Sequence, residues 1–200
     1  MTKAIMEIGV NLGQDTESFL SGSEDYTYYG FEPTYYLLPN LVEKFSDREN
    51  VIFIPMAVDI ENRIASFNIA NWHDWGCSSL HSFSDDIKQT WPDNPAFFGK
   101  KQNLLTIRID TFCDIYKIDS VEKIWIDAQG NDFNVIKSMG KYIDGLKSGR
   151  LEVSYNVNLY KDVDNSYKSA TAWLTERGFK FDVLYDNTSQ KCEANILFYR

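Results

Sequence analysis

The residues with the clearest chemical meaning lie near the N-terminus, where an apolar run over residues 4–8 is followed by Gly9, Asn11 and Gly13. Glycine lets the backbone turn sharply and approach a ligand closely, because no Cβ lies in the way. A carboxylate, Glu32, closes the next apolar segment, and an acid at the end of a second strand can accept both hydroxyls of a ribose. This combination predicts a site for a nucleoside-containing cofactor.

The glycine spacing argues against a dinucleotide. The dinucleotide fingerprint is G-x-G-x-x-G, whose second glycine makes room for a pyrophosphate. Asn11 takes that position here, so a nicotinamide-dependent enzyme is the weaker alternative. An acid followed by G-x-x-x-G is instead similar to the loop of S-adenosylmethionine (SAM) methyltransferases, with Glu7 in the place of the acid.

Composition favours an ordinary globular enzyme. The chain has 200 residues, of which 44% are apolar and 15% aromatic, enough for a full core. Its formal charge of −9 disfavours nucleic acid and anionic membranes as partners. Apolar runs fall short of the roughly 20 residues that cross a bilayer, and the three cysteines form no C-x-x-C pair. We therefore expect no membrane insertion, a reducing compartment and a cytoplasmic location.

Strands and helices alternate along the chain. Apolar runs predict strands over 4–8, 26–32, 50–54, 63–69, 103–109, 122–127, 149–155, 178–185 and 194–199, and three-to-four spacing predicts helices over 34–46, 131–139 and 166–176. Such alternation predicts an α/β fold, with a mostly parallel sheet and helices on both faces. With one antiparallel strand added, this fold is similar to that of Rossmann-like class I methyltransferases, which implies a seven-stranded sheet. The last two strands read as a C-terminal antiparallel hairpin.

Residues 1–200 are predicted to form a single SAM-dependent methyltransferase domain, because no linker or repeat interrupts them. The first strand begins so close to Met1 that no room is left for the helices that usually precede such a core. Two explanations stay open: a minimal catalytic domain, or a domain excised from a longer multidomain protein.

A second motif, over residues 124–132, ends a buried strand with Asp127 and opens a helix. Ligands of open α/β sheets lie beyond the carboxyl ends of the strands, so Asp127 and Glu32 should face one crevice. With the loop over residues 7–14, the Phe-Glu-Pro triplet at 31–33 and this late motif in order, the chain resembles the FkbM family of methyltransferases. The resemblance covers nearly the whole chain.

The resemblance and the chemistry together imply how SAM would be held. Glu7 would reach the methionine end of the cofactor. Glu32 would hold the ribose hydroxyls, and the apolar edge of the adenine would lie against Met56 and Ala57. The loop around the methionine moiety would be formed by Gly9, Asn11 and Gly13, with Gln14 and Thr16 offering backbone amides to its carboxylate.

The acceptor is expected at the irregular segment 71–81. Aromatic rings and hydroxyls are concentrated there, and such groups stack on and hydrogen-bond to a polar ring such as a sugar. The alternative is a packed loop that only covers the cofactor. The candidate substrate-binding residues are Trp72, His73, Trp75, Ser78 and Ser79, together with Glu152 after a later strand.

A sugar hydroxyl is a weak nucleophile at neutral pH, so a base or a metal should handle its proton. His81 is the first candidate base, since imidazole titrates near neutrality, and Asp127 is the second. A divalent metal held by Asp127 and Glu152 is the alternative, although no convincing third ligand is evident; Glu152 could equally be a structural acid.

The sequence thus predicts a SAM-dependent O-methyltransferase that acts on a sugar hydroxyl of a glycan or glycolipid precursor. Two other functions stay open. One is a noncatalytic Rossmann-like module that positions a neighbouring glycosyltransferase domain, and the other is methylation of a small natural product. Expected partners are a sugar or glycan acceptor and glycosyltransferase domains in the same chain or pathway.

Overall fold

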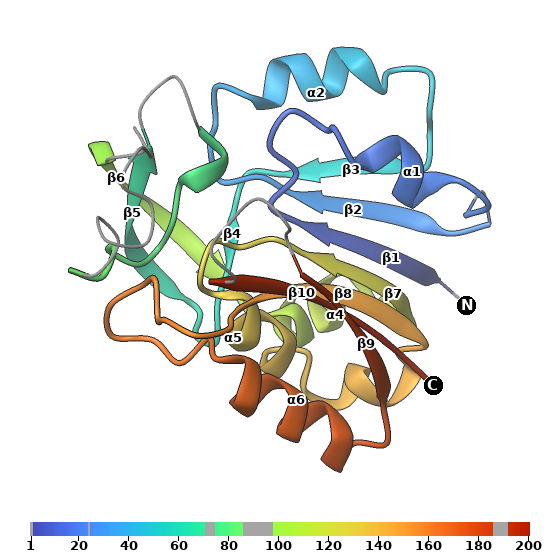
Figure 1. Ribbon diagram of the computed structural model, residues 1–200. Coiled ribbons are helices and arrows are strands. Elements are labelled where there is room, and N and C mark those ends of the chain that lie inside the picture. Colours follow the sequence, from blue (N-terminus) through green and yellow to red (C-terminus); the bar gives the residue numbers. More distant parts are fainter. Residues whose placement is uncertain (1, 24, 71–74, 86–97, 186–191) are drawn as a thin grey trace.

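The main sheet has the predicted mostly parallel order. The computed structural model describes residues 2–23, 25–70, 75–85, 98–185 and 192–200, and within these ranges seven strands form one sheet (Figure 1). The pairs of β10 with β8 and with β9 are antiparallel and the other pairs of this sheet are parallel, so the predicted fold class and C-terminal hairpin are confirmed. From edge to edge the strands are β3 (Val51–Ile54), β2 (Thr27–Phe31), β1 (Lys3–Ile8), β7 (Ser120–Ile126), β8 (Ser148–Ser154), β10 (Glu193–Tyr199) and β9 (Lys180–Tyr185).

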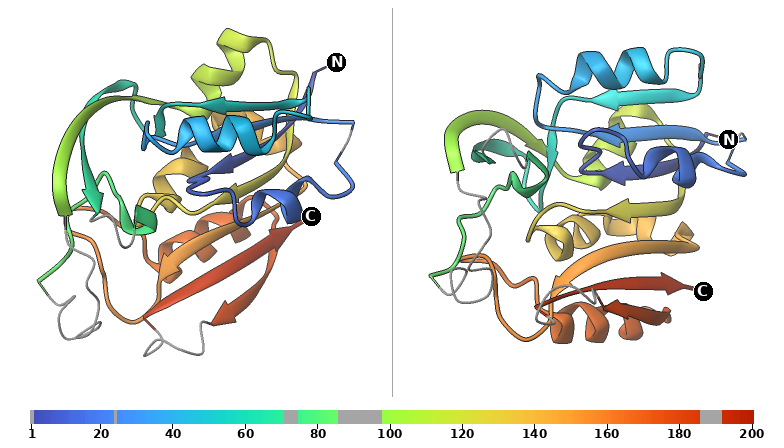
Figure 2. Two further views of the ribbon diagram at one scale, coloured as in Figure 1. Left: turned by 90° about the horizontal axis from the view of Figure 1, so that it is seen from above. Right: turned by 45° about the horizontal axis from the view of Figure 1, so that its top comes forward.

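Helices cover both faces of this sheet, because side chains alternate along each strand. Ala4, Met6 and Ile8 point into a core shared with α4 (Ile109–Tyr116), α5 (Asp132–Lys137) and α6 (Tyr167–Glu176). Ile5 points to the other face, towards α1 (Thr16–Leu20) and α2 (Leu38–Lys44). Figures 1 and 2 show α2 and α6 on opposite sides of the sheet. None of the helices that the structure describes is long and apolar enough to cross a membrane.

Two predicted strands lie outside the main sheet. Segments 63–69 and 103–109 fall in β5 (Arg63–Ala70) and β6 (Phe98–Ile107), which pair antiparallel with each other, while β4 (Ala57–Val58) pairs parallel with β6. In the first half of β5, exposed Ile64 and Ser66 alternate with buried Ala65 and Phe67, the pattern of a sheet with one face in solvent, whereas the last three residues, 68–70, are all buried. This small sheet lies beyond the carboxyl ends of β1, β2 and β3 (Figure 1).

Helix boundaries differ from the predictions for local reasons. The segment predicted as strand 103–109 changes to helix α4 after Arg108, because Ile109, Phe112 and Cys113 recur at helical spacing and are buried. The helix predicted over 34–46 begins only at Leu38, with a proline in its first turn. Short α1 and the 3-10 helices η1 (Trp75–Cys77) and η2 (Gly140–Gly145) had no clear periodicity.

The loop after β1 is fixed by a close backbone approach. The amide of Gly9 donates to the Phe31 carbonyl at 2.9 Å, and Gly9 has a positive φ of 86°. A Cβ built on Gly9 would lie 1.9 Å from the carbonyl oxygen of Asp127. The absent side chain therefore makes room for the loop after β7, whereas the sequence suggested room for a ligand.

Replacing Gly9 tests this close approach. Gly9→Ala should lower the free energy of unfolding by about 3 kcal/mol or more, since backbone would have to move. Gly22→Ala is the matched control, because Gly22 also has a positive φ but its Cβ would meet nothing within 4 Å. The control should lose only about 1–2 kcal/mol. If urea unfolding shows that both variants lose the same free energy of unfolding, the contact between Gly9 and Asp127 imposes no constraint.

Candidate functional site

A pocket lies where the strands of the main sheet end and the small sheet begins. The empty space in it, open solvent included, is about 590 Å³. Loops after β1, β2, β3 and β7 all contribute to it. Its lining residues are Ile8, Gly9, Asn11, Phe31, Glu32, Pro33, Thr34, Met56, Ala57, Val58, Phe67, Gly76, Ser78, Leu80, Asp127, Ala128, Gln129 and Asn131.

Glu32 provides the carboxylate at the wall of this pocket. One of its oxygens accepts a hydrogen bond from the backbone amide of Asn11 at 2.7 Å, and the other accepts one from the backbone amide of Thr34 at 2.7 Å. Burial raises the pKa of Glu32 while these amides oppose the rise. Each carboxylate oxygen has two acceptor positions, so Glu32 can still accept hydrogen bonds from a ligand diol.

Two further features suit a nucleoside attached to an amino acid. Met56, Ala57 and Val58 give the pocket an apolar side next to the polar Glu32. The Oδ1 atom of Asn11 is buried and has no hydrogen-bond partner among the residues that the structure describes. A buried acceptor without a donor is costly, and a bound ammonium group would satisfy it. These two acceptors and the apolar side therefore fit SAM, whose ribose hydroxyls and ammonium group are donors.

Glu7 and Thr16 lie behind the loop and are absent from the pocket lining. The Glu7 carboxylate accepts hydrogen bonds from the Thr16 hydroxyl at 2.9 Å and from the Tyr28 hydroxyl at 2.6 Å. Burial raises the pKa of Glu7 to about 7, although both hydroxyls oppose the rise. These contacts tie the start of α1 to β1 and β2.

Gly13 and Gln14 also lie outside the pocket lining. The Gln14 side chain accepts a hydrogen bond from the Leu12 amide at 3.1 Å, and the Lys44 ammonium donates to the Gly13 carbonyl at 2.6 Å. Both contacts brace the loop itself. Of the residues predicted to hold the cofactor, the structure therefore brings Gly9, Asn11, Glu32, Met56 and Ala57 to one pocket.

Asp127 follows β7, is half-buried and lines the same pocket as Glu32. The Oδ1 atom of Asp127 accepts a hydrogen bond from the side-chain amide of Gln129 at 2.7 Å, and burial raises the pKa of Asp127. Burial and the nearby charge of Asp127 also raise the pKa of Glu152. Asp132 accepts a hydrogen bond from the Glu152 backbone amide at 3.1 Å, and burial raises its pKa to about 7.

In the described part of the chain, no group of three or more His, Cys, Asp or Glu side chains could hold a metal ion.

The predicted acceptor segment reaches the pocket in part. The Ser79 hydroxyl donates to the Gln129 carbonyl at 2.6 Å and accepts from the His81 amide at 2.9 Å, while Ser78 lines the pocket. Trp72 and His73 lie outside the described residues, and only the backbone of Trp75 is described, in η1. His81 is half-buried and contacts Asn131, which lines the pocket.

Three residues of the site were not assigned a role from the sequence. Gln129 and Asn131 belong to the motif over 124–132, so their position was a signal that could have been used. Tyr160 gave no signal: it comes from the loop after β8 and donates to the Gln129 side chain at 2.9 Å. Its ring lies against Gly130, where an added Cβ would be only 2.3 Å from a ring carbon.

A family model now identifies this arrangement. The methyltransferase FkbM domain matches residues 7–181, a range that contains every residue lining the pocket. The chain belongs to the FkbM methyltransferase family. No curated protein matches the sequence closely enough to indicate a relationship.

Solved structures share the fold. The FkbM methyltransferase from Methylobacillus flagellatus is 12% identical with a TM-score of 0.60, and the match covers 99% of this chain and 44% of that one. Fibrillarin from Methanococcus jannaschii is 15% identical (TM-score 0.53; 99% and 66% covered). Fibrillarin from Aeropyrum pernix, solved with natively bound SAM, is 14% identical (TM-score 0.50; 98% and 65% covered). The chain thus spans less than half the length of the FkbM structure that it matches.

Glu32 is the residue of this FkbM domain whose replacement tests the cofactor pocket. Glu32→Gln should weaken SAM binding by about 1.5–3 kcal/mol, the range for hydrogen bonds to a charged group. Isothermal titration calorimetry measures the change. Glu43→Gln, which removes an exposed carboxylate on α2, is the control and should bind SAM as the wild type does. Unchanged affinity in Glu32→Gln would refute the ribose assignment.

Glu7 predicts a pH dependence of folding. Its pKa is about 7 in the folded state and near 4.5 in the unfolded chain, so the folded state binds the proton more tightly. Stability from this group is therefore present at low pH and lost as the pH rises from 4.5 to 7, by about 3 kcal/mol. Between pH 5 and pH 8, the free energy of unfolding measured in urea should fall less in Glu7→Gln than in the wild type. In Glu43→Gln, the free energy of unfolding should depend on pH as it does in the wild type. The same pH dependence in all three proteins would show that burial does not raise the pKa of Glu7.

Proposed function

We propose that this FkbM-family domain is a SAM-dependent O-methyltransferase that acts on a sugar hydroxyl of a glycan or glycolipid precursor. The observation that carries the proposal is the pocket itself: a buried carboxylate, an apolar side and an unsatisfied acceptor converge at the carboxyl ends of the strands. Family membership and the SAM bound by the archaeal fibrillarin, which has the same fold, support the cofactor.

The residues around the pocket would divide the cofactor between them. Glu32 would accept the ribose hydroxyls, Met56 and Ala57 would border the adenine, and Asn11 Oδ1 would accept from the ammonium group of the methionine part. Glu7 would act indirectly, since its carboxylate already holds Thr16 and Tyr28.

SAM supplies an electrophilic methyl group on a sulfonium sulfur, so the chain itself has to align the acceptor and receive its proton. Ser78, Ser79 and Gln129 gather polar groups at the pocket edge. His81 is the proposed base. Asp127 is the second candidate, because burial raises its pKa and makes its carboxylate more basic than an exposed aspartate. A divalent metal on Asp127 and Glu152 is the alternative way to handle the proton.

The acceptor and partners follow from the same proposal. The segment 71–81, which is predicted to bind the acceptor, contains tryptophans, hydroxyls and an amide, and these groups suit a sugar ring. The domain would work in the cytoplasm beside glycosyltransferase domains, in the same chain or pathway, that build the glycan.

The deciding experiment is methyl transfer from isotope-labelled SAM to a panel of free sugars, nucleotide sugars, oligosaccharides and small hydroxylated natural products, followed by mass spectrometry. A label on a sugar oxygen is expected. His81→Ala should lower kcat about 10²–10⁴-fold, the usual contribution of a general base, with SAM affinity nearly unchanged.

The other outcomes separate the alternatives. Turnover that EDTA abolishes, together with active His81→Ala and inactive Asp127→Asn and Glu152→Gln, would replace the histidine base with a metal. A label on the natural products alone would reassign the substrate. Tight SAM binding with no transfer to any member of the panel would favour a noncatalytic module.

A further inference from the structure

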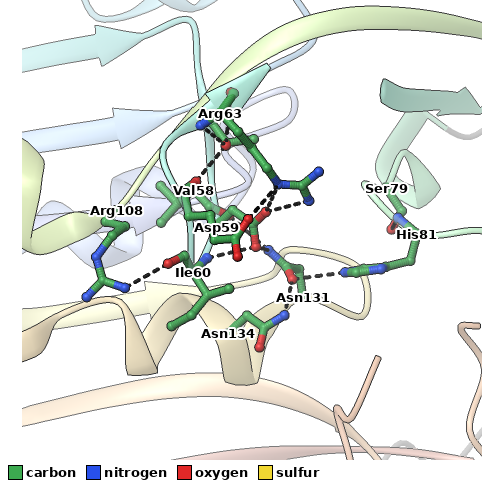
Figure 3. A network of polar contacts seen from close by, with 11 residues as sticks. Val58, Asp59, Ile60, Arg63, Ser79, His81, Arg108, Asn131 and Asn134 are labelled. Carbon is green, nitrogen blue, oxygen red and sulfur yellow. Dashed lines mark hydrogen bonds and ion pairs between the residues drawn. The ribbon is translucent and has the colours of Figure 1, made fainter. Parts of the chain in front are cut away.

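The His81 imidazole is held by one side chain at the start of α5. Its Nε2 lies 2.9 Å from Oδ1 of Asn131 (Figure 3). Imidazole nitrogens can donate or accept, so this contact by itself leaves open which nitrogen carries the hydrogen. The partners of Asn131 decide the question.

The orientation of the Asn131 amide is fixed from the other side. Its Nδ2 donates to the Val58 carbonyl at 3.0 Å and lies 3.3 Å from Oδ1 of Asp59, whose carboxylate is paired with Arg63 at 2.9 Å. A carbonyl and a paired carboxylate only accept. Turning the amide over would set oxygen against oxygen at both contacts, so Oδ1 must face His81.

The remaining acceptor position of Oδ1 is also filled. Asn134 donates its side-chain amide to Asn131 Oδ1 at 2.9 Å, so all the hydrogen-bonding positions of this buried amide are used when His81 Nε2 donates. A neutral His81 therefore carries its hydrogen on Nε2 and its lone pair on Nδ1.

Capping does not explain this asparagine. Asn131 occupies the N-cap of α5, where asparagine usually accepts a hydrogen bond from a helix amide, but its side chain makes no capping hydrogen bond. The side chain instead joins β4, which borders the apolar side of the pocket, to the candidate base (Figure 3).

We infer that Asn131 is a positioning residue that holds His81 as the Nε2–H tautomer and leaves Nδ1 as the basic nitrogen. This inference rests on the proposed function. As the acceptor oxygen bonds to the methyl carbon, its proton moves to His81 Nδ1, and the electron pair of the broken carbon–sulfur bond stays on sulfur. The imidazolium that forms keeps its Nε2–H donated to Asn131, so no other group moves.

Nitrogen NMR of protein labelled with ¹⁵N-histidine tests the inference without requiring turnover. The chain has two histidines, so His73→Gln assigns the His81 signals. In the neutral imidazole of the wild type, the nitrogen shifts should report a single Nε2–H tautomer. Asn131→Ala should give a mixture of Nδ1–H and Nε2–H tautomers like that of a free histidine side chain, and its kcat should fall at least about tenfold.

Two variants control for general damage to α5. Asn131→Ser keeps a preferred N-cap residue but removes the amide, so the helix start is preserved and the tautomer should still be mixed. Asn134→Ala removes the second donor but leaves the His81 contact, so it should keep the single tautomer.

The outcomes distinguish this inference from the proposed function. A wild type that methylates while its His81 is already a mixture, or an Asn131→Ser variant that keeps both the tautomer and kcat, would overturn the positioning role and leave the methyltransferase intact. A single tautomer in a wild type that methylates no acceptor would overturn the proposed function and, with it, the catalytic meaning of the contact.

Discussion

The site depends on how closely two loops approach each other. Gly9, after β1, lies against the carbonyl of Asp127, after β7, with no space for a Cβ between them. Adjacent parallel strands bring their carboxyl ends to one edge, and this approach then decides how near the Glu32 and Asp127 sides of the pocket come. A side chain at Gly9 would separate two loops that both line the pocket.

Buried carboxylates surround this approach, and each costs free energy unless hydrogen bonds compensate. Glu32 receives two backbone amides, and Glu7 receives two hydroxyls. Asp132 receives the amides of Ala128 and Glu152, which fastens the loop after β7 to β8. Burial raises the pKa in all three cases, so the acids that order the loops also weaken the fold as the pH rises. These buried acids order the loops of the pocket at a cost in the free energy of unfolding.

The acceptor side is held to the cofactor side by a second polar network. Asp59, almost fully buried, pairs with Arg63 and lies beside Asn131, so the small sheet is attached to the loop after β7 (Figure 3). Arg108 adds a hydrogen bond to the Ile60 carbonyl at 2.7 Å. Since buried polar groups tolerate few alternative arrangements, this network fixes where His81 can lie relative to the pocket.

The main sheet, the loop glycines and the position of Glu32 at a strand end could be predicted from the sequence, because they depend on short-range spacing and on side-chain alternation along each strand. The same alternation places Glu7 on the face of Ile5, but the hydrogen bonds from Thr16 and Tyr28 to its carboxylate depend on the three-dimensional fold. Tertiary structure also decided that β5 and β6 form a separate sheet, that Tyr160 reaches Gln129, and that Asn131 holds His81. Those contacts join residues far apart in the chain, and a side chain's residue type does not specify which distant partner completes its hydrogen bonds.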